Sequence, residues 1–169
     1  MDTDPTYTIF AGDHCLGSGT HAAALQIIAA QPGDGPTVLV FADTDGRQTE
    51  LDALPEPVPR GRGRPKLGVT AREVTLLPRH WDWLAAQPGG ASVALRRLVE
   101  SARRSDAARA RSAQEAAYRF INAIAGNQPG HEEALRALFA NDLDSFAQRI
   151  AAWPADIRGY ALKLAGAAG

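Results

Sequence analysis

The sequence has little of what a disulfide-bonded, metal-bound or membrane-spanning protein needs. It has one cysteine among 169 residues, so no disulfide can form within the chain. Its four histidines are too scattered for a four-ligand zinc spacing, and we expect no metal and no cofactor. No apolar run approaches the roughly 20 residues of a membrane span. Met1 leads into acidic residues rather than a basic and then apolar signal region. We therefore expect a cytoplasmic protein without membrane contacts.

Basic residues are scarce outside the middle of the chain. The sequence carries 18 Lys and Arg against 19 Asp and Glu, a formal net charge of -1. Residues 1–59 hold one basic and nine acidic side chains, residues 60–111 hold twelve and four, and residues 112–169 hold five and six. These segments have net charges of -8, +8 and -1. A nearly neutral total thus hides a basic middle third, which is typical of a segment that binds a polyanion.

Residues 1–51 predict a small α/β module. Their aromatic and β-branched content indicates strands, and Gly at turn positions separates them. The predicted elements are a strand over 6–11, a second strand from Cys15, a helix over 21–30 capped by Ser18 or Thr20, a strand over 37–41 and a hairpin turn at Asp45-Gly46.

Three further segments follow this module. Residues 52–68 read DALPEPVPRGRGRPKLG, with seven Pro or Gly among seventeen positions, and predict a linker. Residues 69–106 predict a strand over 69–77, a helix from Pro78 to about Gln87 and a second helix with Ser92 as its N-cap. Residues 107–169 predict antiparallel helices over about 107–125, 131–140, 142–152 and 155–165. The expected fold class is therefore α+β.

The stretch RGRGRPK at residues 60–66 indicates nucleic-acid binding. Gly lets the backbone lie close to DNA, Pro keeps the chain extended, and Arg side chains fit a narrow A·T-rich minor groove, where the negative potential is deepest. The segment resembles the core of an AT-hook, a minor-groove peptide. A solvated linker is the alternative interpretation. The side chains expected to contact DNA are Arg60, Arg62, Arg64 and Lys66.

The order of elements after this stretch is strand, Pro-initiated helix, glycine turn and basic helix. Residues 69–104 in this order resemble a ribbon-helix-helix module, in which two chains pair one strand each into a ribbon that enters the major groove. The resemblance implies a homodimer that binds double-stranded DNA. It also implies a phosphate at the N-terminus of the second helix, near Ser92. Further DNA contacts are expected from Arg72, Arg79, Arg96 and Arg97.

Two registers are open for the predicted ribbon, residues 70–76. In the first register, Leu77, Thr75 and Glu73 face inward, and Leu76, Val74 and Arg72 face DNA. In the second, Val74 and Leu76 face inward, and Thr75, Glu73 and Ala71 face DNA. The two registers differ by one residue, which exchanges the faces of the whole strand. Neither presents a strongly basic surface, so a strand in an intramolecular sheet is the alternative.

Longer strings resemble a family of uncharacterised bacterial proteins, a domain of unknown function, over nearly the whole chain. The strings are residues 63–100, AQEAAYRFINAIAGNQPG at 113–130 and IAAWPADIRGYAL at 150–162. This resemblance implies no activity.

We expect no enzymatic activity. The polar residues around the first glycine-rich turn are the nearest approach to a nucleophile with a base, but no oxyanion-hole or phosphate-loop signature accompanies them: His14, Cys15, Ser18 and His21. One hypothesis is a DNA-binding transcriptional regulator that uses the basic arm and the ribbon-helix-helix-like module. The alternative is an interaction or scaffold protein whose basic segment packs on its own acidic N-terminal module. Exposed arginines would favour the DNA-binding hypothesis. Arginines that are neutralised by acids such as Asp43 or Asp45 would favour the scaffold hypothesis.

Overall fold

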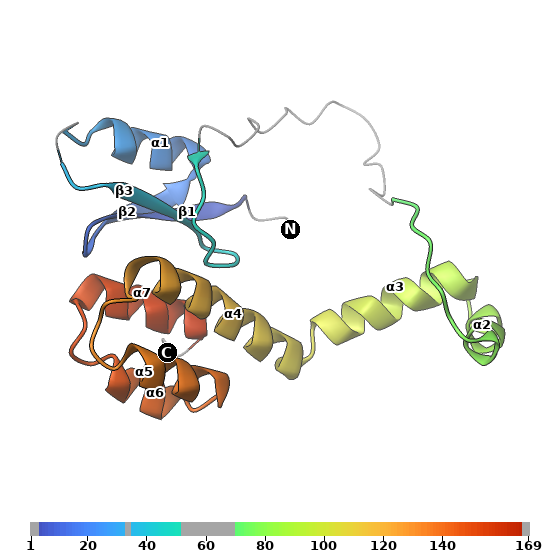
Figure 1. The fold of residues 1–169 in the computed structure, drawn as a ribbon. Coiled ribbons are helices and arrows are strands. Elements are labelled where there is room, and N and C mark those ends of the chain that lie inside the picture. The colour runs from blue at the N-terminus through green and yellow to red at the C-terminus, as the bar shows by residue number, and fades with distance from the viewer. Residues whose placement is uncertain (1–3, 33–34, 52–69, 167–169) are drawn as a thin grey trace. The chain divides into compact units, whose positions relative to one another are not determined.

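The computed structural model describes residues 4–32, 35–51 and 70–166, which form three strands and seven helices (Figure 1). The expected α+β class is confirmed. The chain divides into two compact units: residues 1–54 with 109–169, here called the sheet unit, and residues 55–108, the two-helix unit. The elements in chain order are β1 (Thr6–Ala11), β2 (His14–Thr20), α1 (His21–Ala29), β3 (Val38–Ala42), α2 (Pro78–Ala85), α3 (Gly90–Arg103), α4 (Asp106–Ile124), α5 (His131–Phe139), α6 (Leu143–Arg149) and α7 (Ala155–Ala165).

The sheet is antiparallel, with the strand order β2-β1-β3. Central β1 pairs with β2 through a short turn at Gly12, where φ is +57°. Successive side chains of a strand point to opposite faces. Accordingly, Ile9 is buried with Ala24 of α1, and Phe10 is buried with the C-terminal helices. Figure 1 shows α1 on one face of the sheet and α4 and α7 on the other.

The larger core of the sheet unit joins segments that are far apart in the sequence. The Phe10 ring centroid lies 5.3 Å from that of Phe120 on α4 and 5.6 Å from that of Tyr160 on α7. Phe41 of β3 packs edge-on against Phe120 at 4.9 Å. Aromatic pairs at these separations add to the stabilisation from burial. Residues 1–51 and the helices after residue 109 therefore share one core, although the sequence predicts them as separate regions.

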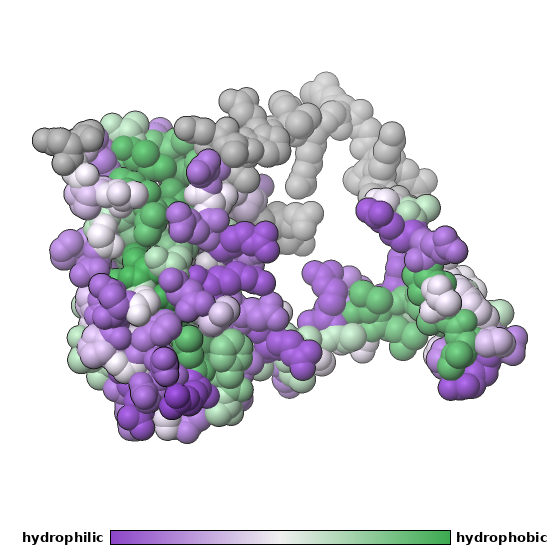
Figure 2. Space-filling model, viewed as in Figure 1, coloured by the Kyte–Doolittle hydropathy of each residue, from purple (hydrophilic) through white to green (hydrophobic). Residues whose placement is uncertain are grey.

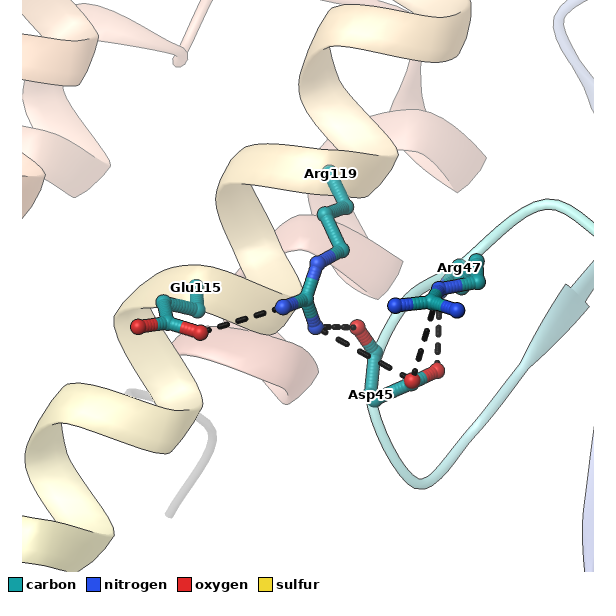
Figure 3. A network of polar contacts seen from close by, with 4 residues as sticks. All are labelled: Asp45, Arg47, Glu115 and Arg119. Atoms are coloured by element: carbon teal, nitrogen blue, oxygen red, sulfur yellow. Dashed lines mark hydrogen bonds and ion pairs between the residues drawn. The ribbon is translucent and has the colours of Figure 1, made fainter.

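The hairpin after β3 is fastened to α4 (Figure 3). Gly46 has φ +65°, as the predicted turn requires, and its amide donates to the Ala42 carbonyl at 2.8 Å. Arg119 of α4 donates to the Asp45 carbonyl at 3.0 Å and to the Glu115 carboxylate at 3.1 Å. These contacts hold the turn directly against the helix.

The two-helix unit matches part of its sequence prediction. Helix α2 begins at Pro78 as expected and ends at Ala85, two residues before the predicted end. The prediction that Ser92 caps the next helix is wrong, because α3 begins at Gly90 with Gly89 as its N-cap. Both glycines adopt positive φ, +85° and +74°, so the turn leads directly into the helix and Ser92 lies in its first turn.

The strand predicted over residues 69–77 is wrong for the single chain. Residues 70–77 form no strand, and no segment in the described part of the chain pairs with them. A strand needs a ladder of hydrogen bonds to a neighbour, so β-propensity alone cannot produce one. Residue 69 lies outside the described residues. None of the helices in the described part is long and apolar enough to cross a bilayer.

Candidate nucleic-acid interface

The two-helix unit exposes much of its apolar side-chain surface. In its described part, residues 70–108, the buried hydrophobic residues are Leu84 of α2 and Ala94 of α3, at 3% and 5% exposure. Figure 2 shows apolar surface along α3 and around α2. The large hydrophobic side chains exposed in this unit are Val74, Leu77, Trp81, Trp83, Leu98 and Val99. Among the described residues of the unit, more large apolar side chains are exposed than buried, which is typical of a surface that contacts a partner.

The arginines predicted to contact DNA are exposed where the structure describes them. Arg96 and Arg97 of α3 project to solvent, as do Arg72 and Arg79, and no acidic side chain in the described part of the unit pairs with them. Arg103, by contrast, pairs with Glu100 one turn earlier, at 3.1 Å. The arm residues Arg60, Arg62, Arg64 and Lys66 lie outside the described residues.

The division into units changes the charge count. The two-helix unit, residues 55–108, contains ten basic and five acidic residues, a net charge of +5. Arg109 and Arg111, which contribute to the basic middle third of the sequence, belong to the sheet unit instead. The remaining eight basic and fourteen acidic residues make that unit -6. Opposite net charges thus coincide with separate structural units.

Asp43, one of the acids that could have neutralised the basic segment, is already engaged inside the sheet unit. Its carboxylate accepts hydrogen bonds from the hydroxyls of Thr6, Thr8 and Tyr160, each at 2.7 Å. The Lys163 ammonium lies 3.5 Å from the same carboxylate. The sequence analysis missed this cluster, because Tyr160 lies 117 residues from Asp43 and no local motif links them.

The cluster shifts the pKa values of its members in opposite directions. Burial raises the pKa of Asp43, but the hydrogen bonds from Thr8, Thr6 and Tyr160 and the charge of Lys163 outweigh burial and leave that pKa below its ordinary value. Burial and the bond to Asp43 raise the pKa of Tyr160. Tyr160 therefore stays protonated and donates, which fits a contact that fastens α7 to the sheet.

The polar residues of the first hairpin do not assemble into a nucleophile with a base. His21 bonds through Nε2 to the Leu51 carbonyl at 3.1 Å, while His14 lies 3.9 Å from Asp156. Partial burial raises the pKa of the Cys15 thiol, which is otherwise exposed, and the negative charge of Asp156 raises it further. A thiol with a raised pKa is a weak nucleophile at neutral pH. Within the described ranges, no three His, Cys, Asp or Glu side chains are placed to hold a metal ion.

The fold and the surface define an α+β protein of two units, of which the smaller is basic and, in its described part, exposes large apolar side chains. The chain belongs to the family described as "Uncharacterized protein conserved in bacteria (DUF2239)", whose model matches residues 53–165. This match includes the basic arm, α2, α3 and the helices α4–α7, and it begins after the three-stranded sheet. Comparisons with curated proteins and with solved structures give no match.

Proposed function

We propose that this protein binds double-stranded DNA as a transcriptional regulator, through a homodimer of its ribbon-helix-helix-like two-helix unit and the basic arm at residues 60–66. The observation that carries the proposal is the exposure of basic and apolar side chains on α3. Arg96 and Arg97 are exposed and pair with no acidic side chain among residues 70–108, the described part of their unit, while Leu98 and Val99 are exposed on the same helix. One face is suited to phosphates and the other to a second copy.

Electrostatics supports the same conclusion. An exposed guanidinium keeps its charge and can bind a phosphate through two hydrogen bonds. A unit with a net charge of +5 that neutralises several phosphates gains affinity chiefly by releasing counterions. The arm would add contacts in the minor groove ahead of α2. The role of the sheet unit in this proposal is to present the DNA-binding unit.

The scaffold hypothesis receives less support. It needs the acids of the N-terminal module to bind the basic segment. Asp43 is bound to three hydroxyls and lies beside Lys163, and Asp45 contacts Arg47 and Arg119 at 3.8 and 3.9 Å. To form ion pairs with the basic arm, these carboxylates would have to lose their partners in the sheet unit.

Salt-dependent binding tests the proposal. We expect a labelled duplex to be bound with weak micromolar affinity when the sequence is arbitrary, and with a slope of log affinity against log salt of about -5 to -7, for roughly six to eight phosphate contacts. Replacing both Arg96 and Arg97 with Ala removes four arginines from the dimer, so it should lower the magnitude of the slope by up to about 4, since each lost phosphate contact removes about 1.

The matched control is the double variant Arg136→Ala and Arg149→Ala. These two arginines are also exposed on helices, and replacing them removes the same charge. They lie, however, on α5 and α6 of the sheet unit. The control should bind DNA with nearly the wild-type slope. If the wild-type protein does not bind duplex at about 50 mM salt, the proposed function is wrong.

A further inference from the structure

The junction between α3 and α4 lacks the kind of residue found where the other helices end. Every other junction between consecutive helices within residues 70–166 holds a positive-φ residue or a proline: Gly89, Gly90, Gly130, Asn141 and Pro154. Arg104 and Ser105 separate α3 from α4, and neither is such a residue. Arg104 keeps right-handed angles, φ -87° and ψ -5°. The backbone at this junction is therefore not forced out of a helix.

The side chain of Ser105 holds the break between the two helices. Its Oγ accepts a hydrogen bond at 3.2 Å from the amide of Ala108, the third residue of α4, which is the geometry of an N-cap. The same hydroxyl donates to the Ala102 carbonyl, in the last turn of α3, at 2.8 Å. One hydroxyl thus satisfies a backbone group at the end of α3 and another at the start of α4.

A continuous helix is the alternative that the flanking sequence favours. Residues 102–111 read ARRSDAARAR, so the strong helix formers Ala and Arg occupy every position except Ser105 and Asp106. In a continuous helix, the Ala108 amide would donate to the Arg104 carbonyl instead of the Ser105 hydroxyl. Serine as an N-cap and aspartate in the first turn both favour the start of a helix. The broken and continuous helices are therefore close in free energy, and these two side chains favour the break.

We propose that the α3–α4 junction is a two-state joint: Ser105 caps α4 in one state, and α3 and α4 form one continuous helix in the other. The boundary between the two units follows at residues 108 and 109, one turn after Ser105. A change of state therefore turns α3, with Arg96 and Arg97, relative to the rest of α4. A ligand that binds one state more tightly shifts the joint toward that state. The joint stands independently, whereas its effect on DNA binding rests on the proposed function.

Two substitutions should displace the joint in opposite directions. Ser105→Ala removes the cap, so it should raise the ratio of continuous to broken helix by about 2- to 30-fold. Asp106→Pro locks the break, because proline fits the first position of α4 but would clash with the Ala102 carbonyl in a continuous helix. The control for the first is Ser112→Ala, since Ser112 is exposed inside α4. The control for the second is Asp106→Asn, which removes the same charge.

Backbone NMR chemical shifts of residues 104–108 in the full chain measure the two states, because Cα shifts distinguish helical from extended residues. Position 105 should be non-helical in wild type. Ser105→Ala should move the shifts toward helical values, Asp106→Pro should leave Ala108 as in wild type, and Ser112→Ala should change none of them. Affinity for a labelled duplex is then compared within each pair at one salt concentration. Ser105→Ala and Asp106→Pro should change the affinity in opposite directions relative to their controls.

Each contrary outcome has its own meaning. The joint is overturned if position 105 is already helical in wild type, or if Ser105→Ala leaves the shifts of residues 104–108 unchanged. It is also overturned if Asp106→Pro removes the helical shift of Ala108, since proline would then not fit the start of α4. A chain that shows the expected shifts but binds no duplex refutes the proposed function and supports the joint. Equal affinities within both pairs, in a protein that binds duplex, overturn the effect of the joint on binding.

Discussion

Gly46 allows the sharpest test of how the sheet unit is assembled. It has φ +65°, and a Cβ built on it would overlap the carbonyl oxygen of Ala116 and lie 2.7 Å from the carbonyl carbon, both main-chain atoms of α4. The far end of a flexible side chain could move aside, but the backbone of a helix cannot move without disturbing the packing of that helix. The Gly46→Ala variant must therefore part the hairpin from α4 or strain both.

Two other glycines of the same unit provide references for the loss of stability expected in Gly46→Ala. Gly166 has φ +75° with nothing within 4 Å of its Cβ position, so Gly166→Ala isolates the backbone strain, which costs about 1 kcal/mol. Gly159 is exposed in α7 and also has open space, so Gly159→Ala should stabilise by about 0.5–1 kcal/mol through helix propensity. Gly46→Ala adds the overlap to the strain and should destabilise by about 2–4 kcal/mol.

Urea unfolding followed by circular dichroism measures the three variants against wild type, with the m-value checked for each. The expected order of stability is Gly159→Ala, wild type, Gly166→Ala and Gly46→Ala. If Gly46→Ala is no less stable than Gly166→Ala, the hairpin does not press on α4 and the reasoning about this contact is wrong. If Gly159→Ala lowers the stability, the expectation that an alanine fits at this open helical position is wrong.

Two further predictions concern the acid cluster and the arm. The lowered pKa of Asp43 means that its ionised form stabilises the fold; this contribution is complete above the unfolded pKa of about 3.9 and is lost as the pH falls through the lower folded value. Asp43→Asn should therefore lower the free energy of unfolding by about 1–3 kcal/mol at pH 7. In urea titrations, the difference in free energy of unfolding between the variant and wild type should become smaller at acidic pH. A difference that does not depend on pH would contradict a stabilising role of the Asp43 carboxylate. Replacing both Arg62 and Arg64 with Ala should weaken binding to A·T-rich duplex more than to G·C-rich duplex if the arm enters the minor groove, and equally if it neutralises phosphates. The thermal midpoint should hardly change, and a marked fall in it would mean that these arginines belong to the fold.

The local elements of this protein could be predicted from its sequence. Periodic apolar residues and flanking Gly and Pro indicated β1, α1, β3 and the helices from residue 106 onward, because short-range sterics and amphipathicity decide such elements. Pro78 marked the first turn of α2, since its ring fits there and its missing amide costs nothing. The turn at Gly46 followed from the need for positive φ. Charge counting also located the basic segment without any coordinates.

Tertiary structure decided what depends on partners distant in the chain. The core of Phe10, Phe120 and Tyr160, and the bonds of Thr6, Thr8 and Tyr160 to Asp43, join residues whose spacing carries no local signal. A strand at residues 70–77 has the right composition but forms no ladder in the single chain, because strand pairing requires a second segment. The start of α3 at Gly90 rather than Ser92 depended on two consecutive left-handed residues, a backbone choice that capping preference alone does not reveal. Sequence decides what each segment favours locally, and the fold decides which of those preferences find a partner.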